Sequence, residues 1–197
     1  PTPLLMAQLE DQSDVIGRIL AIQALSKNKS QKTIDALRQC LASDPFHGVR
    51  MEAADALKSI HTMEALDALL ESSEQSDARV RLRVQSAIGG FYNSRALESA
   101  IKTIRSESNP TIINTAMRSL SGYGSSEISS ILLQYLREPS YRNTHAESAI
   151  AAMEKQDDPV FIMPILETLM ERKGLFSTRG MVNALSSLAY LGRHQDD

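Results

Sequence analysis

The sequence predicts an all-α chain, an α-α superhelix of about six antiparallel helix pairs. Three observations lead to this prediction: a repeat of about 32 residues, two amphipathic segments within each repeat, and a composition with 42% hydrophobic but only 5% aromatic residues. The apolar fraction depends on Ala and Leu, which favour helices. Because one repeat is too short to bury its own apolar face, the repeats are expected to stack on one another.

The repeat is defined by the Leu or Ile that closes the second segment of each unit. These residues are separated by 32, 31, 32, 30 and 38 positions, and they are Leu25, Leu57, Ile88, Leu120, Ile150 and Leu188. We therefore expect one domain over residues 1–197, with repeats at about 1–28, 29–61, 62–92, 93–123, 124–155 and 156–193. Since the chain begins at Pro1 without Met, we also expect it to be a piece of a longer protein.

The first segment of each repeat has apolar residues at the i, i+3, i+4, i+7 spacing of a helix with one buried face. An example is Ile34, Leu37 and Leu41. Ser30, Ser94 and Ser125 precede such segments and are predicted to cap them. Gly residues past the helix ends are predicted to be left-handed caps, and they are Gly89, Gly90, Gly122, Gly124 and Gly192.

The second segment of each repeat has small residues three apart, as in Ala53 and Ala56, which leave a smooth stripe where a neighbouring helix can approach closely. Polar residues before these segments are predicted helix caps, and they are Asp14, Asp44, Asp77 and Asn109. Pro45 and Pro110 follow two of them at a first-turn position, where a helix tolerates proline. No segment shows the sustained alternation of a strand.

Charge and cysteine content exclude several classes of protein. The formal net charge is -3, which removes the bulk electrostatic attraction to nucleic acid. No stretch has the roughly 18 apolar residues of a membrane span. The single cysteine, Cys40, cannot form an intramolecular disulfide. Its place between Leu37 and Leu41 predicts a buried hydrophobic residue rather than a nucleophile.

Residues 44–57, Asp-Pro-Phe-His-Gly-Val-Arg-Met-Glu-Ala-Ala-Asp-Ala-Leu, resemble the second-helix signature of HEAT and HEAT-like repeats. The resemblance implies a HEAT/ARM-like solenoid and a ladder of Asp and Arg side chains between repeats. In this sequence the ladder residues are Asp44, Arg18, Arg50 and Arg81. Ile113, Asn143 and Met181 stand at the Arg position in later repeats, so the ladder is expected only in the first half.

Residues 8–18 and 44–50 are together similar to the helical C-terminal region of bacterial aminopeptidase N-like zinc peptidases. That resemblance implies a non-catalytic domain that packs against the catalytic domain of a zinc aminopeptidase and shapes or gates its active site. Zinc is then expected only in that catalytic domain, because this chain has no H-E-x-x-H motif. The four histidines are scattered and are predicted to be surface or loop residues: His47, His61, His145 and His194. We predict no catalytic, cofactor-binding or metal-binding residue here.

Two clusters are candidates for a binding face. Arg79 and Arg83 share one side of a helix at i, i+4, and they are interpreted either as a phosphate-binding patch or, preferably, as a solvated face. Tyr135 and Tyr141 belong to an aromatic group that is interpreted either as a docking surface or, preferably, as core, and its other members are Phe161, Phe176 and Tyr190. Met163, Met170 and Met181 are predicted to fill gaps between helices.

The functions left open differ in their partners. The first is the aminopeptidase domain described above, and the second is a stand-alone HEAT-repeat scaffold that binds a protein or peptide on its concave face. A third, an enzyme acting on DNA or on a bilin, is known on HEAT-like folds but needs a catalytic carboxylate in a basic or aromatic groove, which the sequence does not present. We expect a protein partner, no nucleic acid and no membrane. One Cys and no signal peptide favour the cytoplasm for this segment.

Overall fold

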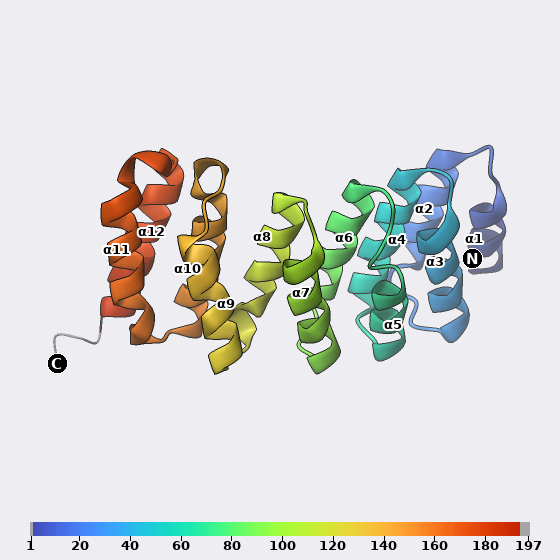
Figure 1. Ribbon diagram of the computed structural model, residues 1–197. Coiled ribbons are helices and arrows are strands. Elements are labelled where there is room, and N and C mark those ends of the chain that lie inside the picture. Colours follow the sequence, from blue (N-terminus) through green and yellow to red (C-terminus); the bar gives the residue numbers. More distant parts are fainter. Residues whose placement is uncertain (1, 194–197) are drawn as a thin grey trace. The chain divides into compact units, whose positions relative to one another are not determined.

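The computed structural model describes residues 2–193, and within that range it contains twelve α-helices, four short 3-10 turns and no strand (Figure 1). The predicted all-α repeat fold is confirmed. The chain divides into two compact units, Pro1–Ser99 and Ala100–Asp197. The division falls within α7 (Ser94–Ser106), and each unit is described by itself.

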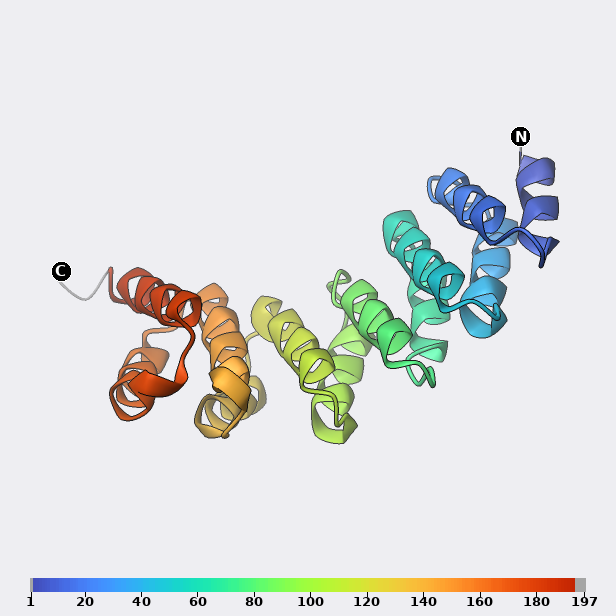
Figure 2. The ribbon, with the colours of Figure 1, turned by 90° about the horizontal axis from the view of Figure 1, so that it is seen from above.

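The first unit is a stack of three helix pairs. Its helices are α1 (Thr2–Glu10), α2 (Val15–Leu25), α3 (Gln31–Ser43), α4 (His47–Ile60), α5 (Met63–Glu71) and α6 (Ala78–Ile88). Consecutive helices pair as α1 with α2, α3 with α4 and α5 with α6. The second helices α2, α4 and α6 lie side by side in one layer, and α3 and α5 lie side by side in the other (Figure 2).

The second unit repeats the arrangement from α8 onwards. Its helices are α8 (Pro110–Ser119), α9 (Ser126–Arg137), α10 (Thr144–Gln156), α11 (Ile162–Arg172) and α12 (Thr178–Gly192). The 3-10 turns are η1 (Leu120–Gly122), η2 (Tyr141–Asn143), η3 (Pro159–Phe161) and η4 (Lys173–Leu175). Helix α10 is central, because it contacts α8, α9 and α12. Helices α8, α10 and α12 therefore form the second-helix layer of this unit.

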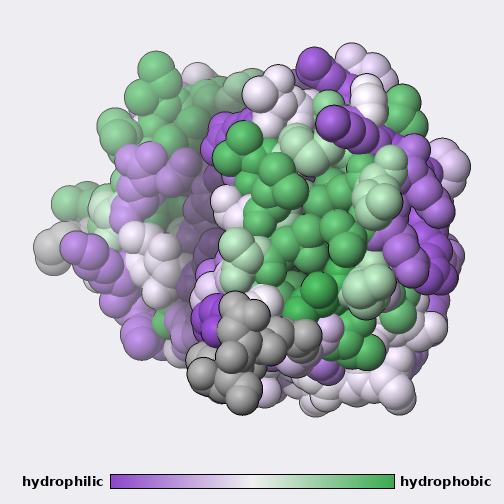
Figure 3. Space-filling view, turned by 90° about the vertical axis from the view of Figure 1, so that its left-hand side faces the viewer, coloured by the Kyte–Doolittle hydropathy of each residue, from purple (hydrophilic) through white to green (hydrophobic). Residues whose placement is uncertain are grey.

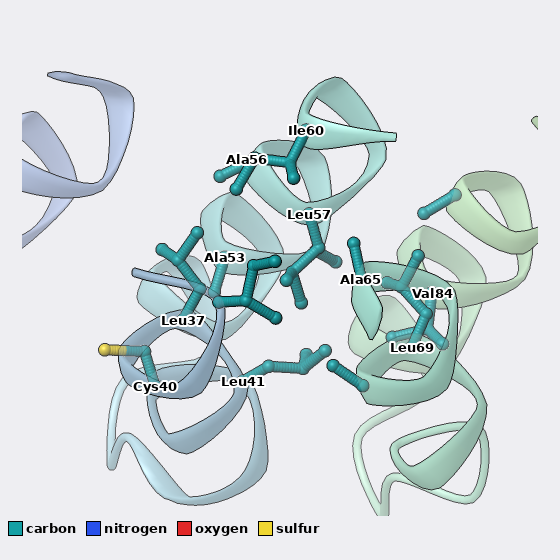
Figure 4. Packing of buried hydrophobic residues seen from close by; sticks show 14 of the residues in the cluster. Leu37, Cys40, Leu41, Ala53, Ala56, Leu57, Ile60, Ala65, Leu69 and Val84 are labelled. Carbon is teal, nitrogen blue, oxygen red and sulfur yellow. The ribbon is translucent and has the colours of Figure 1, made fainter. Parts of the chain in front are cut away.

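The core of the first unit lies between its two helix layers (Figure 4). Leu37 and Leu41 of α3 point toward Leu57 of α4, and all three are fully buried. Burying each such side chain contributes about 1.5–3 kcal/mol before conformational entropy is counted. The small residues Ala53 and Ala56 of α4 are also buried, as the stripe of small residues predicted. Cys40 lies at the edge of this core and is buried, as predicted.

Most of the predicted helix caps are confirmed. Side chains that accept a backbone N–H at the start of a helix are Asp14, Ser30, Asp77, Asn109 and Ser125. Pro110 opens α8 as expected.

Three residues at helix starts lie elsewhere than predicted. Helix α4 begins at His47 with Phe46 at the N-cap, so Pro45 precedes the helix rather than lying in its first turn. Asp44 accepts the N–H of Phe46 but does not cap the helix, because its carboxylate is also bound by Arg18. At α7, Ser94 is already helical, and the Asn93 side chain accepts the N–H of Arg95 in the role predicted for Ser94.

The prediction of left-handed glycine caps is wrong. No glycine among residues 2–193 has a positive φ, and Gly89 ends α6 in right-handed geometry. The left-handed C-caps are instead His61 after α4 and Asp157 after α10, with φ of 54° and 55°. Each has a side-chain partner that offsets the cost of this conformation. The His61 ring stacks on Phe91, and the Asp157 carboxylate pairs with Arg193.

Candidate functional site

The predicted ladder begins with a buried ion pair between the first two repeats. The Arg18 guanidinium donates through Nε to Asp44 Oδ2 at 2.8 Å and through Nη2 to Asp44 Oδ1 at 3.2 Å. Its Nη1 donates to the carbonyl oxygen of Asp11 at 2.6 Å. The side chains of Arg18 and Asp44 are 1% and 3% exposed, so both charges are removed from water and each depends on the other.

Arg50 and Arg81 lie at the same register position as Arg18, and each holds the turn before its own helix. Arg50 Nη1 donates to the carbonyl of Asp44 at 2.6 Å. Arg81 Nη1 donates to the carbonyls of Gln75 and Ser76, both at 2.9 Å. Each of the three arginines therefore donates a hydrogen bond to a backbone carbonyl that lies six or seven residues before it in the sequence. This network joins repeats and orders turns, and it offers no open surface to a ligand.

The candidate basic face on α6 is occupied by ion pairs within the chain. Arg79 pairs with Asp77 at 2.7 Å, and the hydrogen bond from Arg79 holds the pKa of the Asp77 carboxyl below its usual range. Arg83 pairs with Asp55 of α4 at 3.1 Å. Both arginines are exposed, but their charge is already partnered by carboxylates. This arrangement agrees with the solvated face and does not favour a phosphate site.

The two candidate tyrosines, Tyr135 and Tyr141, differ in burial. Tyr135 is buried, and its hydroxyl donates to the carbonyl of Ile104 at 2.8 Å. Burial raises the pKa of this hydroxyl. Tyr135 thus belongs to the core and cannot serve a binding face, whereas Tyr141 is 84% exposed.

The aromatic and methionine groups near the C-terminus also divide between core and surface. Phe161 is fully buried, but Tyr190 is exposed beneath the Arg193 guanidinium. Met163 and Met170, predicted to fill gaps between helices, are exposed instead. Helix α11 packs against α12 and α9, while Met163 and Met170 lie on its exposed side.

A groove of about 640 Å³ crosses the second-helix layer of the second unit. It extends over α8, η2, α10 and the first turns of α12. The larger polar, charged and aromatic side chains that line it are Asn114, Arg118, Tyr141, Glu147 and Asn183. Two amides, one guanidinium, one carboxylate and one phenol therefore border a single open space, together with the smaller residues Pro110, Thr111, Thr144, Ser148 and Ala151. We take this groove as the candidate functional site.

Buried partners hold two of these side chains in place. Asn114 Oδ1 lies 2.6 Å from His145 Nδ1. Because an amide oxygen can only accept, Nδ1 carries the proton in this bond. Burial lowers the pKa of His145, so the imidazole is neutral at pH 7. Arg118 is exposed, and its guanidinium donates to the hydroxyls of Ser148 and Thr115 at 3.2 and 3.3 Å. Among residues 2–193 no carboxylate forms an ion pair with Arg118.

Glu147 stands on the wall that the groove shares with a smaller hollow of about 210 Å³ between α10 and α12. Its Oε1 accepts a hydrogen bond from the Ser177 hydroxyl at 3.1 Å. The close approach depends on Gly180, since a Cβ at that position would lie 1.7 Å from Glu147 Oε1. The Ser177 hydroxyl also accepts the N–H of Gly180 at 2.9 Å and so caps α12.

Sequence reasoning did not identify the groove residues Asn114, Arg118, Glu147 and Asn183. They come from three helices, α8, α10 and α12, which begin at Pro110, Thr144 and Thr178, and no local motif unites them. One usable signal was present: Asn114 interrupts an otherwise apolar segment of α8, where a polar residue needs a buried partner.

The residue types that most often serve in catalysis and metal binding lie as follows in the structure. Within residues 2–193 no group of three or more His, Cys, Asp or Glu residues is placed to hold a metal ion. Burial raises the pKa of the Cys40 thiol to about 11, so it is a poor nucleophile at neutral pH. His47 lies against Phe46, and His61 stacks on Phe91. The prediction of a surface or loop position is wrong for His145, which is buried within α10 because its ring bonds to Asn114. His194 lies outside the described residues.

None of the helices in the described range is both long and apolar enough to span a membrane.

Comparison with known proteins supports the fold. Residues 2–89 match the family model for HEAT repeats. The family likeness therefore concerns the first unit, and the first solved structure below extends the likeness in fold to the rest of the chain. The chain is similar over 98% of its length to a solved engineered protein, at 16% identity, a TM-score of 0.55 and 96% coverage of that chain. It also aligns with the complex of CpcE and CpcF of phycocyanin lyase from Nostoc sp. PCC7120, at 15% identity and a TM-score of 0.48, covering 97% and 94% of the two chains.

These likenesses concern the fold alone. The search of curated proteins found no match to this sequence. The comparisons give no support to the resemblance to zinc aminopeptidases.

Proposed function

We propose that this HEAT-like chain is a non-catalytic helical-repeat scaffold that binds an extended segment of another protein in the groove of its second unit. The observation that carries the proposal is a groove of about 640 Å³ bordered by an exposed tyrosine and by a guanidinium without an ion-pair partner. Repeat folds expose long helix layers to a partner, because each repeat contacts only its neighbours.

The groove chemistry indicates what such a segment carries. The Asn183 amide is exposed and can both donate to and accept from the backbone of an extended peptide. Arg118 can bind a carboxylate, whereas its present contacts are hydroxyl groups only. The Tyr141 ring offers an apolar surface at the edge of the groove. The expected ligand is an extended segment with an acidic side chain close to an apolar one.

Selection from a displayed peptide library tests the proposal. Peptides enriched on the wild-type chain should contain an acidic residue beside an apolar one, and they should lose about 10–100-fold in affinity for Arg118→Glu, the range of a charge-assisted hydrogen bond. Arg105→Glu is the matched control, because Arg105 is an exposed arginine of the same unit that already pairs with Glu127 and does not line the groove. Equal losses for both variants, or no enriched peptide, would contradict a groove-binding function.

A second proposal is that the chain packs against and gates the catalytic domain of a zinc aminopeptidase. Its support is the similarity of residues 8–18 and 44–50 to that family. Several of these residues have structural roles that explain their presence. Gln8 donates to Asp14, Asp14 caps α2, and Arg18 binds Asp44.

The complete gene tests this second proposal. An H-E-x-x-H motif encoded upstream in the same reading frame would support it. A complete reading frame without that motif would contradict the aminopeptidase proposal.

A further inference from the structure

The hollow between α10 and α12 is a second open space in the second unit, and two carboxylates line it. It measures about 210 Å³, and its charged side chains are Glu147 and Glu154 of α10. Both are half-buried, and neither forms an ion pair with a cation among residues 2–193. These charges distinguish the hollow from the side of α11 and α12 that Figure 3 shows, where hydrophobic side chains gather.

Hydroxyl groups of α12 and its cap hold both carboxylates in place. Glu147 accepts a hydrogen bond from Ser177, and Glu154 accepts one from Ser187. Both donors are neutral, and a carboxylate offers about four acceptor positions, so each glutamate keeps capacity for a further donor. Because the surroundings of a half-buried group are less polar than bulk water, a cation that enters the hollow is attracted more strongly than at a fully hydrated carboxylate.

The shape of the hollow suits one long side chain with a charged end. Glu147 and Glu154 are seven positions apart on α10, which is about 10.5 Å along the helix. The lining between them is small and apolar, and it includes Ala151, Gly180 and Ala184. Lysine and arginine place an apolar stem along such a surface and their charge at its edge. A metal ion fits less well, because no third His, Cys, Asp or Glu of the described residues joins the two carboxylates.

The hollow and the groove share part of their lining. Glu147, Ala151 and Asn183 border both spaces. A segment that lies in the groove can therefore place one of its side chains in the hollow. Across the second-helix layer the unpaired charge changes sign, from Arg118 on α8 to Glu147 and Glu154 on α10.

We propose that the hollow binds a lysine or arginine side chain of the same segment whose acidic side chain binds Arg118. This inference rests on the proposed function and adds that the partner segment carries both charges. An acidic residue alone brings a carboxylate toward Glu147, which also borders the groove, and it leaves Glu154 without a cation. A basic residue in the hollow offsets the repulsion and pairs with the carboxylates, so the two charges of the segment complement those of the site.

Helix packing sets the expected spacing of the two charges. Adjacent helices lie about 8–10 Å apart, and the hollow is one and a half such intervals from α8, or about 12–15 Å. An extended chain advances about 3.3 Å per residue, so this distance corresponds to about four residues. Residues four apart also point to the same side of an extended chain. The partner segment is therefore expected to carry its acidic and basic residues about four positions apart.

Parallel selections from one displayed peptide library, on the wild-type chain, Glu154→Gln and Glu154→Lys, test the hollow. Glu154 lines the hollow but not the groove, so both changes leave the lining of the groove as it is. Wild-type peptides should contain a Lys or Arg about four positions from the acidic residue, and they should bind Glu154→Gln roughly tenfold more weakly. On Glu154→Lys, the basic residue should disappear from the enriched peptides while the acidic residue remains.

The matched control is Glu167→Gln, which removes an exposed carboxylate of α11 that lines neither space, and it should bind as the wild type does. Far-UV circular dichroism checks that the variants remain folded. Peptides that depend on Arg118 but show no preference for a basic residue overturn this inference and leave the proposed function standing. Equal affinity of the selected peptides for Glu154→Gln and Glu167→Gln also overturns it. A library without any enriched peptide overturns both proposals.

Discussion

The two units join their repeats with different chemistry. In the first unit, four contacts between repeats are ion pairs, and these are Arg18–Asp44, Arg38–Glu71, Arg83–Asp55 and Arg95–Asp67. In the second unit, several such contacts use hydroxyl, amide or imidazole groups, and these are Asn114–His145, Arg118–Ser148, Tyr135–Ile104, Glu147–Ser177 and Glu154–Ser187. The exposed pairs Arg105–Glu127 and Arg193–Asp157 add charge at its surface.

This difference shows how one repeat architecture can serve two purposes. Charges that are paired within the chain, above all the buried Arg18 and Asp44, fix neighbouring repeats but are not available to a partner. Polar groups whose partner carries no opposite charge, such as Arg118 and Glu147, keep further donors and acceptors, and the groove lies among them. The contrast agrees with the proposal that a partner binds in the groove of the second unit.

The strongest test of this contrast breaks the buried ion pair. Asp44→Ala should destabilise the first unit by about 3–5 kcal/mol, because Arg18 is left charged, buried and unpaired. Replacing both partners, as Arg18→Met with Asp44→Leu, should recover most of that loss. Urea unfolding combined with hydrogen exchange measured by mass spectrometry separates the two units.

Asp55→Ala is the matched control for the buried pair, since Asp55 and Arg83 form a contact between repeats in the same unit but are 39% and 44% exposed. Its expected effect is about 1 kcal/mol or less. Comparable losses for Asp44→Ala and Asp55→Ala would show that burial does not distinguish the two contacts.

The next largest effect concerns the reactivity of Cys40 in the first unit. With a pKa near 11 instead of 9.0, its thiolate fraction at pH 8 is lowered about 100-fold. Alkylation by iodoacetamide should be slower than that of the urea-unfolded chain by at least this factor. Because this is the chain's single thiol, the rate also reports on the first unit, and Asp44→Ala should accelerate it. Rapid labelling of the native wild type would contradict a buried thiol.

A smaller effect distinguishes the second unit by its dependence on pH. The pKa of His145 is lowered by burial, with a weaker opposing influence from Glu138. Its contribution to stability is complete above the unfolded value of about 6.5 and decreases as the pH falls toward the folded pKa, since the unfolded chain then binds a proton that the folded one does not. The slope is at most about 1.4 kcal/mol per pH unit.

Thermal unfolding between pH 7.5 and 5 measures this dependence. His145→Gln should reduce the slope for the second unit, because glutamine does not titrate. An unchanged slope in the variant would assign the pH dependence to another group.

The smallest predicted effect tests whether the neutral contacts of the second unit contribute individually. Tyr135→Phe removes the hydrogen bond to the Ile104 carbonyl and should cost about 1 kcal/mol. Tyr141→Phe should cost nothing measurable, because that side chain is 84% exposed. Chemical denaturation of both variants is the measurement, and a loss in Tyr141→Phe would indicate a structural role for the exposed tyrosine.

The fold could be predicted from the sequence because the same pattern of apolar residues recurs in successive repeats. The spacing of Leu37 and Leu41 specifies a helix, and the recurrence of Leu25, Leu57 and Ile88 specifies how helices stack. The caps were less predictable, since His61 and Asp157 take left-handed geometry where their side chains contact Phe91 and Arg193. These partners are distant in sequence.

The binding surfaces could not be predicted for a related reason. The groove joins Asn114, Glu147 and Asn183 only after three repeats have stacked, and each looks like an ordinary polar residue in its own segment. The exposure of Met163 and Met170 was missed because an apolar pattern marks a face that favours contact without saying whether a neighbour is present.

The Ser177 hydroxyl has two hydrogen-bond partners and so connects the wall of the groove to the start of α12. It donates to Glu147 on the groove wall and accepts from the backbone that begins α12. A ligand that draws Glu147 toward itself therefore removes one partner of the group that caps α12, and fraying of that first turn becomes linked to occupancy. By reciprocity, a contact that tightens α12 changes the affinity of the groove by the same factor.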